Sequence, residues 1–308
     1  MLADDVAGDP MTGRRWTWRS LAKLCAALDR RGVVVSPGTL RRLLRARGIG
    51  PRVDRKHLEP RAHPDRDRQF RYIGRQRRRF VRAGWPILSA DCKKKERIGR
   101  FKNPGRTWRR RPYEVLTHDF PDAADYQAIP YGVYDVGAGD GHVYVGLDHE
   151  TADLAVAALA AWWRGIGRHR YPAAPRVLVL VDGGGGNGAR LHRYKQQLQV
   201  RLADPFGLTV TVCHYPPGAS KWNPIEHRLF SQISQTWAGT PLESLAIVLD
   251  AIRRTRTRTG LRVGATLWWR AFPLYLRVSA EEMASLALRP HRVFPVWNYT
   301  IKPRQNGK

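Results

Sequence analysis

The chain has 308 residues, 43% of them hydrophobic, and its 54 Lys and Arg residues outnumber 26 Asp and Glu for a formal net charge of +28. This length is enough for about two domains with sizeable cores, which excludes a wholly disordered chain. Self-repulsion of that size does not stabilise a folded domain, so the charge predicts a polyanionic partner.

Membrane insertion and export are not supported by the sequence. The longest apolar run, from Leu154 to Trp163, is half the length of a bilayer span. Asp4 and Asp5 stand where a signal peptide would carry basic residues. The three cysteines are odd in number and lack CxxC spacing, so we expect reduced thiols and neither a disulfide framework nor a zinc finger. A cytoplasmic protein follows.

After a leader of residues 1–13, residues 14–55 predict a small all-α module. Leucines recur at helical spacing until Gly32 interrupts the pattern. Ser36 then caps a second helix, in which Leu43 is among the leucines predicted to face inward, and Gly48 ends it. Two short helices joined by a tight turn are typical of a helix-turn-helix.

The second predicted helix has a basic outer face. Arg41, Arg42 and Arg45 lie there, where the recognition helix of a helix-turn-helix would contact DNA. An ordinary helical pair with a charged exterior is the alternative.

Positive charge is concentrated in residues 55–111, which hold 21 Lys and Arg against five Asp and Glu. Within them, residues 56–84 are predicted to be a basic linker. Phosphate contacts release counterions, so such a stretch would bind DNA with a steep salt dependence. A solvated linker without contacts is the alternative, but interleaved aromatic residues favour nucleic acid. Together with two cations farther along, the predicted DNA contacts are Arg75, Arg77, Arg78, Arg79, Lys93, Lys94, Lys95, Lys221 and Arg228.

Three acidic residues stand where a chain would hold metal ligands. Asp91 and Asp182 close aliphatic runs, so each carboxylate should emerge at the end of a strand. Glu226 follows Asn223-Pro224, which predicts a helix start with Asn as the cap and Pro in the first turn. Carboxylates in such positions can hold two Mg²⁺ ions, with Mn²⁺ as a substitute, and two such ions clamp both oxygens of a phosphodiester displacement.

Several motifs together resemble one family. They are the run Cys213-His214-Tyr215-Pro216-Pro217-Gly218-Ala219-Ser220-Lys221-Trp222-Asn223-Pro224-Ile225-Glu226-His227-Arg228-Leu229-Phe230, the block around Asp91, His118-Asp119-Phe120, Asp182-Gly183-Gly184-Gly185 and Trp297-Asn298-Tyr299-Thr300. Taken in the order in which they occur along the chain, they are similar to the ISAzo-thirteen family of insertion-sequence transposases, over about residues 8–303. Members usually begin with a longer region, so the resemblance also predicts an N-terminally shortened copy.

The resemblance implies an α/β, ribonuclease-H-like layered fold, a mixed sheet flanked by helices, over residues 85–270, followed by a C-terminal extension of residues 271–308. It implies a DDE transposase that binds the ends of a mobile element, cleaves DNA strands by metal-dependent hydrolysis and joins the 3′ hydroxyl to target DNA. Asp91, Asp182 and Glu226 would be the catalytic metal ligands. Double-stranded DNA and further copies of the chain on that DNA would be the partners. A catalytically silent DNA-binding regulator and a ribonuclease-H-type nuclease remain alternatives.

Some residues have competing interpretations. Residues 183–188 formally satisfy the GxGxxG dinucleotide fingerprint, but the carboxylate of Asp182 would face the pyrophosphate. His227 is a candidate active-site neighbour. Each of three further acidic residues near strand ends could replace one of the three proposed ligands, and these are Asp119, Asp135 and Asp148.

Overall fold

The computed structural model describes residues 7–8, 15–17, 19–51 and 63–304. The chain divides into two compact units, Met1–Glu59 and Pro60–Lys308, and each is described by itself. Most of the predicted leader, and residues 56–62 of the predicted linker, lie outside the described residues.

The first unit contains the two predicted helices. A pair of short antiparallel strands, β1 (Ala7–Gly8) and β2 (Arg15–Trp16), precedes α1 (Leu21–Asp29) and α2 (Pro37–Ala46). The side chain of Ser36 caps α2, because its oxygen accepts a hydrogen bond from the N–H of Thr39 at 3.1 Å. Gly32 has a φ of +80°, which fits the predicted break between the helices.

The helices of this unit pack through Leu24, Leu28 and Leu40. The expectation that Leu43 faces inward is wrong, since its side chain is 44% exposed. Leu43 lies one residue before the partly buried Leu44, and a turn of 100° per residue carries it out of this small interface.

Much of the predicted basic linker is a regular helix. Residues Arg66–Arg82 form α3, whose buried positions Gln69, Tyr72, Ile73 and Phe80 fall on one face. That face packs on the sheet of the second unit, beside strands β3 and β7. The linker prediction is therefore corrected over this range: the arginines occupy the solvent side of an amphipathic helix.

The second unit is built on a nine-stranded mixed sheet. Its central strands run in the order β8-β7-β3-β5-β6, with β5 antiparallel to both β3 and β6, and with β7 parallel to both β3 and β8. This arrangement confirms the predicted ribonuclease-H-like fold. The strands are β3 (Ile87–Cys92), β4 (Glu96–Ile98), β5 (Tyr126–Asp135), β6 (Asp140–Gly146), β7 (Arg176–Val181), β8 (Thr209–His214), β9 (Val263–Leu267), β10 (Leu288–Pro290) and β11 (Asn298–Ile301).

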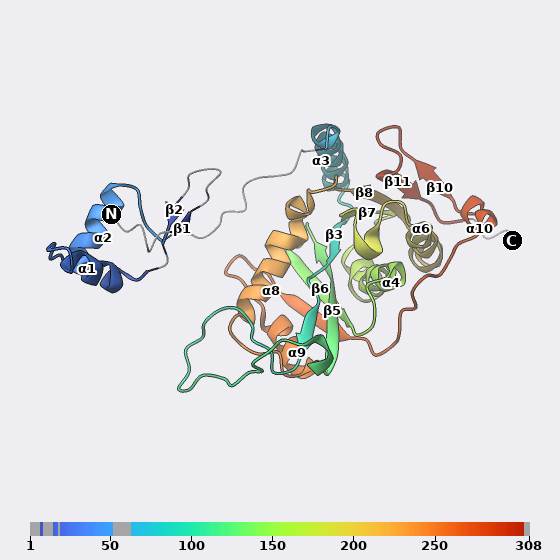
Figure 1. Ribbon diagram of the computed structural model, residues 1–308. Coiled ribbons are helices and arrows are strands. Elements are labelled where there is room, and N and C mark those ends of the chain that lie inside the picture. The colour runs from blue at the N-terminus through green and yellow to red at the C-terminus, as the bar shows by residue number, and fades with distance from the viewer. Residues whose placement is uncertain (1–6, 9–14, 18, 52–62, 305–308) are drawn as a thin grey trace. The chain divides into compact units, whose positions relative to one another are not determined.

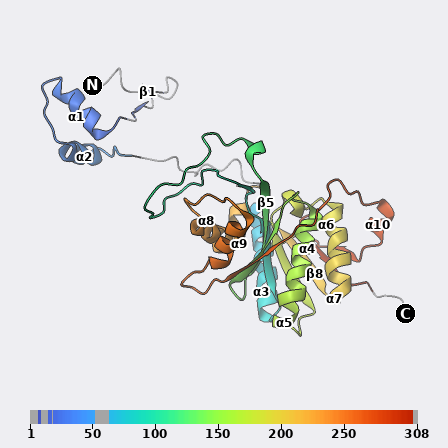
Figure 2. The ribbon, with the colours of Figure 1, turned by 90° about the horizontal axis from the view of Figure 1, so that it is seen from below.

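Helices cover both faces of this sheet. Figure 2 shows α4 and α6 on one side of it and α8 and α9 on the other. Leu88 and Ala90 of β3 point into the core under α4, whereas Ile87 points into the core under α3, because successive strand residues face opposite ways. The helical segments are η2 (Pro121–Ala123), α4 (Ala152–Trp162), η3 (Trp163–Gly167), α5 (Arg168–Arg170), η4 (Gly185–Asn187), α6 (His192–Leu198), η5 (Gln199–Ala203), α7 (Asp204–Phe206), η6 (Ser220–Trp222), η7 (Glu226–Phe230), α8 (Ser231–Thr236), α9 (Leu245–Arg254) and α10 (Ala280–Ala284).

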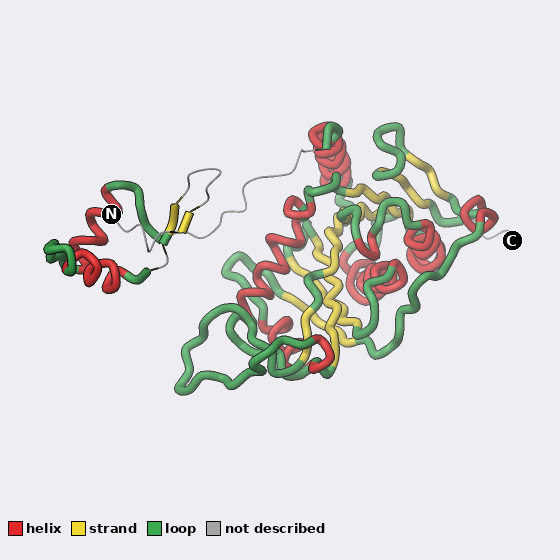
Figure 3. The backbone as a smooth tube through the Cα atoms, in the orientation of Figure 1, coloured by secondary structure: helices red, strands yellow, loops and turns green. Residues whose placement is uncertain are grey.

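The C-terminal segment belongs to the same sheet. Strand β11 pairs antiparallel with β8, and β10 pairs with β11, so residues predicted as an extension complete one edge of the sheet. Between β4 and β5 the backbone is mostly loop (Figure 3). None of the helices that the structure describes is long and apolar enough to cross a membrane.

The packing of α3 predicts unequal effects at two neighbouring positions. Phe80 is 1% exposed and Val81 is 69% exposed. Phe80→Ala should lower the free energy of unfolding by about 3–5 kcal/mol because it empties a core position. Val81→Ala should change that free energy by less than about 0.5 kcal/mol. Urea denaturation of both variants checks this, and equal stability of the two would show that α3 does not pack on the sheet.

Candidate active site

The three predicted acidic residues come from three elements at one edge of the sheet. Asp91 is the penultimate residue of β3, and Asp182 directly follows β7. Because these strands are parallel, their carboxyl ends meet at the same edge. Glu226 is the first residue of η7, whose neighbouring residues pack against the same face of the sheet that Ser89 occupies.

A buried hydrogen-bond cluster joins β3 to the start of the Glu226 helix. The hydroxyl of Ser89 donates to Oδ1 of Asn223 and accepts from the N–H of Ile225 at 3.0 Å. The amide of Asn223 in turn donates to Oδ2 of Asp91 at 3.4 Å. The predicted helix start at Pro224 is confirmed. The predicted cap is corrected, because Ser89 caps this helix from another strand while the side chain of Asn223 points to Asp91.

A glycine allows the Glu226 helix to approach the sheet closely. Gly132 of β5 is the register partner of Asp91. A Cβ atom at position 132 would lie 2.7 Å from the ring of Phe230 and 2.9 Å from Ile225. Any larger residue there would therefore push the helix, and Glu226 with it, away from Asp91.

Asp182 is fixed through its own backbone. Its carbonyl oxygen lies 2.9 Å from Nδ1 of His214, and its Oδ1 accepts from the N–H of Gly184 at 3.2 Å. Burial lowers the pKa of His214 to about 4, so the ring is neutral at pH 7. Since a carbonyl only accepts, Nδ1 holds the proton and Nε2 accepts from the hydroxyl of Tyr299. His214 thus positions the strand end and is not a candidate ligand.

The three carboxylates oppose one another's ionisation. Burial, followed by the charges of Asp182 and Glu226, raises the pKa of Asp91 to about 8. The pKa of Asp182 is raised by burial and by Glu150, and that of Glu226 by burial and by Asp182. Like charges gathered in a partly desolvated place are favourable for a bound cation, which needs the carboxylates ionised.

The donor chemistry therefore fits a hard divalent cation, which prefers carboxylate oxygens. Among the described residues, however, no three Asp, Glu, His or Cys side chains converge into a complete metal-binding cluster. The protein oxygens alone do not close a coordination shell, and an Mg²⁺ site of this kind is completed by water and substrate oxygens.

Glu150 is a site residue that the sequence analysis missed. It precedes α4, accepts from the N–H of Gly186 at 3.3 Å and lies 3.8 Å from the ammonium of Lys95. A Cβ atom at Gly185 would collide with its carboxylate, so the glycine block is shaped around it. It lies four residues after the end of β6 and directly before Thr151, the cap of α4, so it does not close an aliphatic run as Asp182 does.

The three alternative acidic residues have other surroundings. Asp135 is fully buried and accepts from Arg170 and from the hydroxyl of Tyr171, which makes it a structural ion pair. Asp148 accepts from the N–H of Phe272. Asp119 is exposed, on the long loop before β5.

Lys93, a predicted DNA contact, and His227, a predicted active-site neighbour, have different surroundings. Lys93 is only 7% exposed, since its ammonium pairs with Glu96 at 2.5 Å and lies over the ring of Trp237. It is therefore unsuited to a phosphate contact. His227 is exposed and donates from Nε2 to the carbonyl of Lys221, and its charge lowers the pKa of Glu226. Those of the predicted cations that are exposed near the site are Lys94, Lys95, Lys221 and Arg228.

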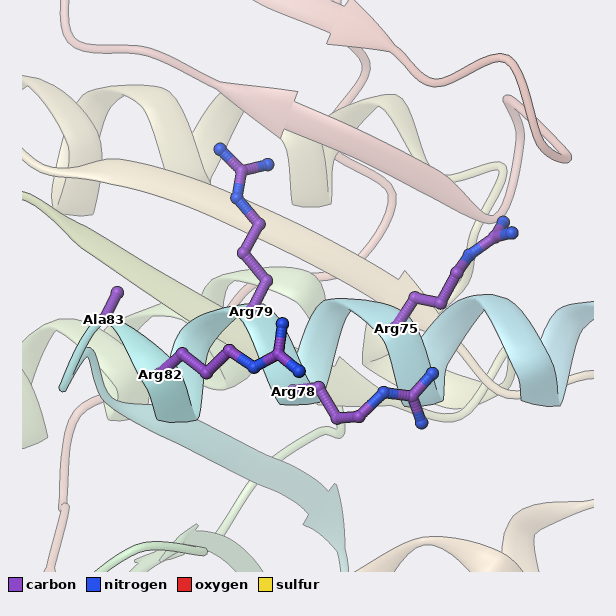
Figure 4. A pocket seen from close by; sticks show the side chains of 5 residues that line it. All are labelled: Arg75, Arg78, Arg79, Arg82 and Ala83. Atoms are coloured by element: carbon purple, nitrogen blue, oxygen red, sulfur yellow. The ribbon is translucent and has the colours of Figure 1, made fainter.

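The arginines of α3 separate into two groups. Arg75, Arg78 and Arg79 are exposed and, with Arg82, line a surface hollow of about 430 Å³ along two turns of the helix (Figure 4). Arg77 points elsewhere. It lines a groove of about 860 Å³ together with Tyr134 of β5 and with residues around the Glu226 helix, among them Pro224, His227, Arg228 and Gln232.

Comparisons with known proteins give one family. The family model described as the Rhodopirellula transposase DDE domain matches residues 1–303. The chain is similar to the Mos1 transposase paired-end complex with left transposon end, at 16% identity and a TM-score of 0.44, over 78% of this chain and 71% of that chain. It is similar to the pre-cleavage Mos1 transpososome at 15% identity and a TM-score of 0.46, over 75% and 64%. With TM-scores below 0.5, these structures add nothing to the assignment. No curated protein matches.

The Ser89 cluster predicts a stability loss larger than that of an ordinary helix cap. Ser89→Ala removes a cap, worth about 1 kcal/mol, and leaves the buried Oδ1 of Asn223 without its donor, at about 1–3 kcal/mol more. The control is Ser244→Ala, which removes only the cap of α9 and should cost about 1 kcal/mol. The measurement is the free energy of unfolding in urea, and equal losses would contradict the role of the cluster.

Proposed function

The chain belongs to the Rhodopirellula transposase DDE-domain family and is therefore a DDE transposase, and we propose that Asp91, Asp182 and Glu226 are its catalytic acids. This membership confirms the resemblance to the ISAzo-thirteen family. The observation that supports this assignment is that partly buried carboxylates from β3, the end of β7 and η7 lie near enough to affect one another: Asp182 and Glu226 raise the pKa of Asp91, and Asp182 raises the pKa of Glu226. Asn223 donates to Asp91, His214 contacts the carbonyl of Asp182, and Ser89 accepts from the N–H of Ile225, next to Glu226.

We propose further that these carboxylates hold two divalent cations, Mg²⁺ or Mn²⁺. When bound, such ions neutralise charge on the attacking and leaving oxygens of an in-line displacement at phosphorus. The protein then needs no nucleophile of its own. In the first reaction, a water oxygen bonds to phosphorus, the bond to the 3′ oxygen breaks, and that oxygen leaves as a hydroxyl. In the second, this hydroxyl attacks a phosphate of the target and releases a target 3′ hydroxyl.

The residues around the acids keep the geometry rigid. Asn223 holds one oxygen of Asp91 and the N–H of Cys92 holds the other at 2.8 Å, so this carboxylate has little rotational freedom. Glu150 keeps the glycine block in place behind Asp182. Such support limits the reorganisation required when charge develops in the transition state.

DNA would lie across the exposed cations of the second unit. Arg75, Arg78 and Arg79 form one track on α3, and Arg77 with Arg228 lines the groove beside the Glu226 helix. Lys94 and Lys95 supply a third basic group, in a pocket that Arg97 and Lys102 also line. Lys221 lies five residues before Glu226 in the sequence, close to the sheet edge that carries the three acids, which we call the acidic edge. These contacts would be to phosphates and would not depend on sequence.

The first unit would supply sequence recognition. Arg41, Arg42 and Arg45 are exposed on α2, as a recognition helix requires. Because the ends of a mobile element come in pairs, we propose that two or more copies act together on DNA. Association with the nucleoid in the cytoplasm follows from the same DNA affinity.

Neutralising one acid should abolish metal-dependent chemistry without unfolding the protein. Asp182→Asn should lose Mg²⁺-dependent strand cleavage. Mg²⁺ at a hundredfold excess over its Kd should stabilise the wild type by about 2.7 kcal/mol and so raise its melting temperature, and the variant should lose this effect as well. Asp91→Asn and Glu226→Gln should behave alike. Gel assays of cleavage and thermal melts with and without Mg²⁺ make the measurement.

The control for this series is Asp250→Asn, an exposed carboxylate paired with Arg254 on α9. It should keep both cleavage and the effect of Mg²⁺. Cleavage retained by Asp182→Asn would remove this residue from the proposed ligands.

The two sets of arginines should differ in what they contribute to DNA binding. Changing Arg75, Arg78 and Arg79 to Gln should make the slope of log affinity against log salt shallower by up to about 2.7, on random and element-end duplex alike. Changing Arg41, Arg42 and Arg45 to Ala should chiefly reduce the preference for element ends. Titrations at several salt concentrations test both, and an unchanged slope in the α3 variant would show that this track does not contact DNA.

A further inference from the structure

One large aromatic side chain beside the acidic edge is left exposed. Trp222 ends η6 and is 51% exposed. It directly precedes Asn223, whose amide donates to Asp91. Consecutive Cα atoms are about 3.8 Å apart, so this ring is attached one residue away from a group that holds a catalytic acid.

The surroundings of Trp222 form a pocket with aromatic and charged walls. The ring of Phe70 on α3 meets the Trp222 ring edge-on, with centroids 6.0 Å apart and an interplanar angle of 78°. The guanidinium of Arg66 lies 5.8 Å from the centroid of Trp222 and 5.7 Å from that of Phe70. These residues border an open surface hollow of about 370 Å³, which is lined by Arg66, Asp67, Phe70, Arg71 and Trp222.

The walls of this pocket are fixed relative to the acidic edge. Next to Phe70, the buried Gln69 donates from Nε2 to the carbonyl of His214 at 2.7 Å. The Phe70 ring also packs against that of Tyr215, at a centroid distance of 5.9 Å. Because His214 also holds Asp182, one set of contacts positions both the pocket and the catalytic strand end.

We propose that this pocket binds one unpaired nucleotide of the DNA next to the phosphate being cut, with its base stacked on Trp222. Every base has a π-face, and stacking on an exposed aromatic side chain is how proteins hold unpaired nucleotides. Arg66 and Arg71 place positive charge where the phosphates of that nucleotide would lie, and Asp67 supplies an acceptor for an amino group of the base. The proposal rests on the proposed function, since it requires DNA at the acidic edge.

The test uses the full chain and two duplexes with the element end, in the absence of divalent metal so that no strand is cut. In one, 2-aminopurine beside the cleavage position is paired, and in the other it is unpaired. Wild-type protein should quench the unpaired probe and prefer that duplex. Trp222→Ala should leave the probe bright and reduce the preference by about 5- to 150-fold, the range expected for one stacked base.

Two further variants separate stacking from packing. Trp222→Phe keeps an aromatic face and should retain quenching, whereas Trp222→Leu keeps apolar bulk without that face and should lose it. Trp269→Ala, which removes a Trp that is 68% exposed and does not line this pocket, should match the wild type. Equal behaviour of the Phe and Leu variants would overturn the proposal, as would a Trp222→Ala variant that changes oligomeric state but not quenching.

Experiments on the wild-type protein distinguish failure of the stacking site from failure of the proposed catalytic function. If wild-type protein cuts element-end DNA with Mg²⁺ but treats the paired and unpaired probes alike, the stacking site is wrong and the catalytic assignment stands. If it neither binds nor cuts that DNA, the proposed function fails and the stacking site fails with it.

Discussion

A single buried hydroxyl, that of Ser89, ties the start of the Glu226 helix to the strand that carries Asp91. Ser89 accepts from the first turn of the Glu226 helix and donates to Asn223, which holds Asp91. Three carboxylates that raise one another's pKa would otherwise separate, because each gains by moving toward water. The close packing of the helix at Gly132 and the contact of His214 with Asp182 act in the same direction. The packing and hydrogen bonds of the folded chain thus hold three mutually repelling carboxylates close together, where a cation would bind them.

The positions of the acids were predictable, whereas their supports were not. Asp91 and Asp182 follow aliphatic runs, and a strand end is where a buried chain first reaches solvent, so local pattern was sufficient. Ser89 and Asn223 are 134 residues apart, and nothing in either segment indicates that one caps the helix of the other. Glu150 lies four residues beyond the end of β6 and closes no aliphatic run, so the local pattern did not identify it. Contacts between distant segments require the topology first.

The prediction of a basic linker was wrong over α3, because the many arginines obscured the helical spacing of its buried residues. Arginine-rich segments are usually solvated, and the composition of residues 66–82 outweighed the four buried positions spaced along one helical face. One of these is Gln69, a polar residue that is nonetheless fully buried. It is buried because it is fully paired, with His214 and with Asn298 of β11. This contact reinforces the pairing of β11 with β8, which together with the pairing of β10 with β11 makes the C-terminal segment part of the core unit.

Because α3 packs on the sheet, this one helix contributes to the core, to the acidic edge and to the basic surface. Its apolar face packs under β3 and β7, its first turns border the acidic edge through Phe70, and its later turns present Arg75, Arg78 and Arg79 to solvent. A flexible linker could bind phosphates as tightly, but it would not fix their distance from the carboxylates. A rigid helix does, since each residue advances about 1.5 Å along its axis. DNA bound by the outer arginines would therefore have a defined register at the acidic edge, and reaction at one chosen phosphate requires such a register.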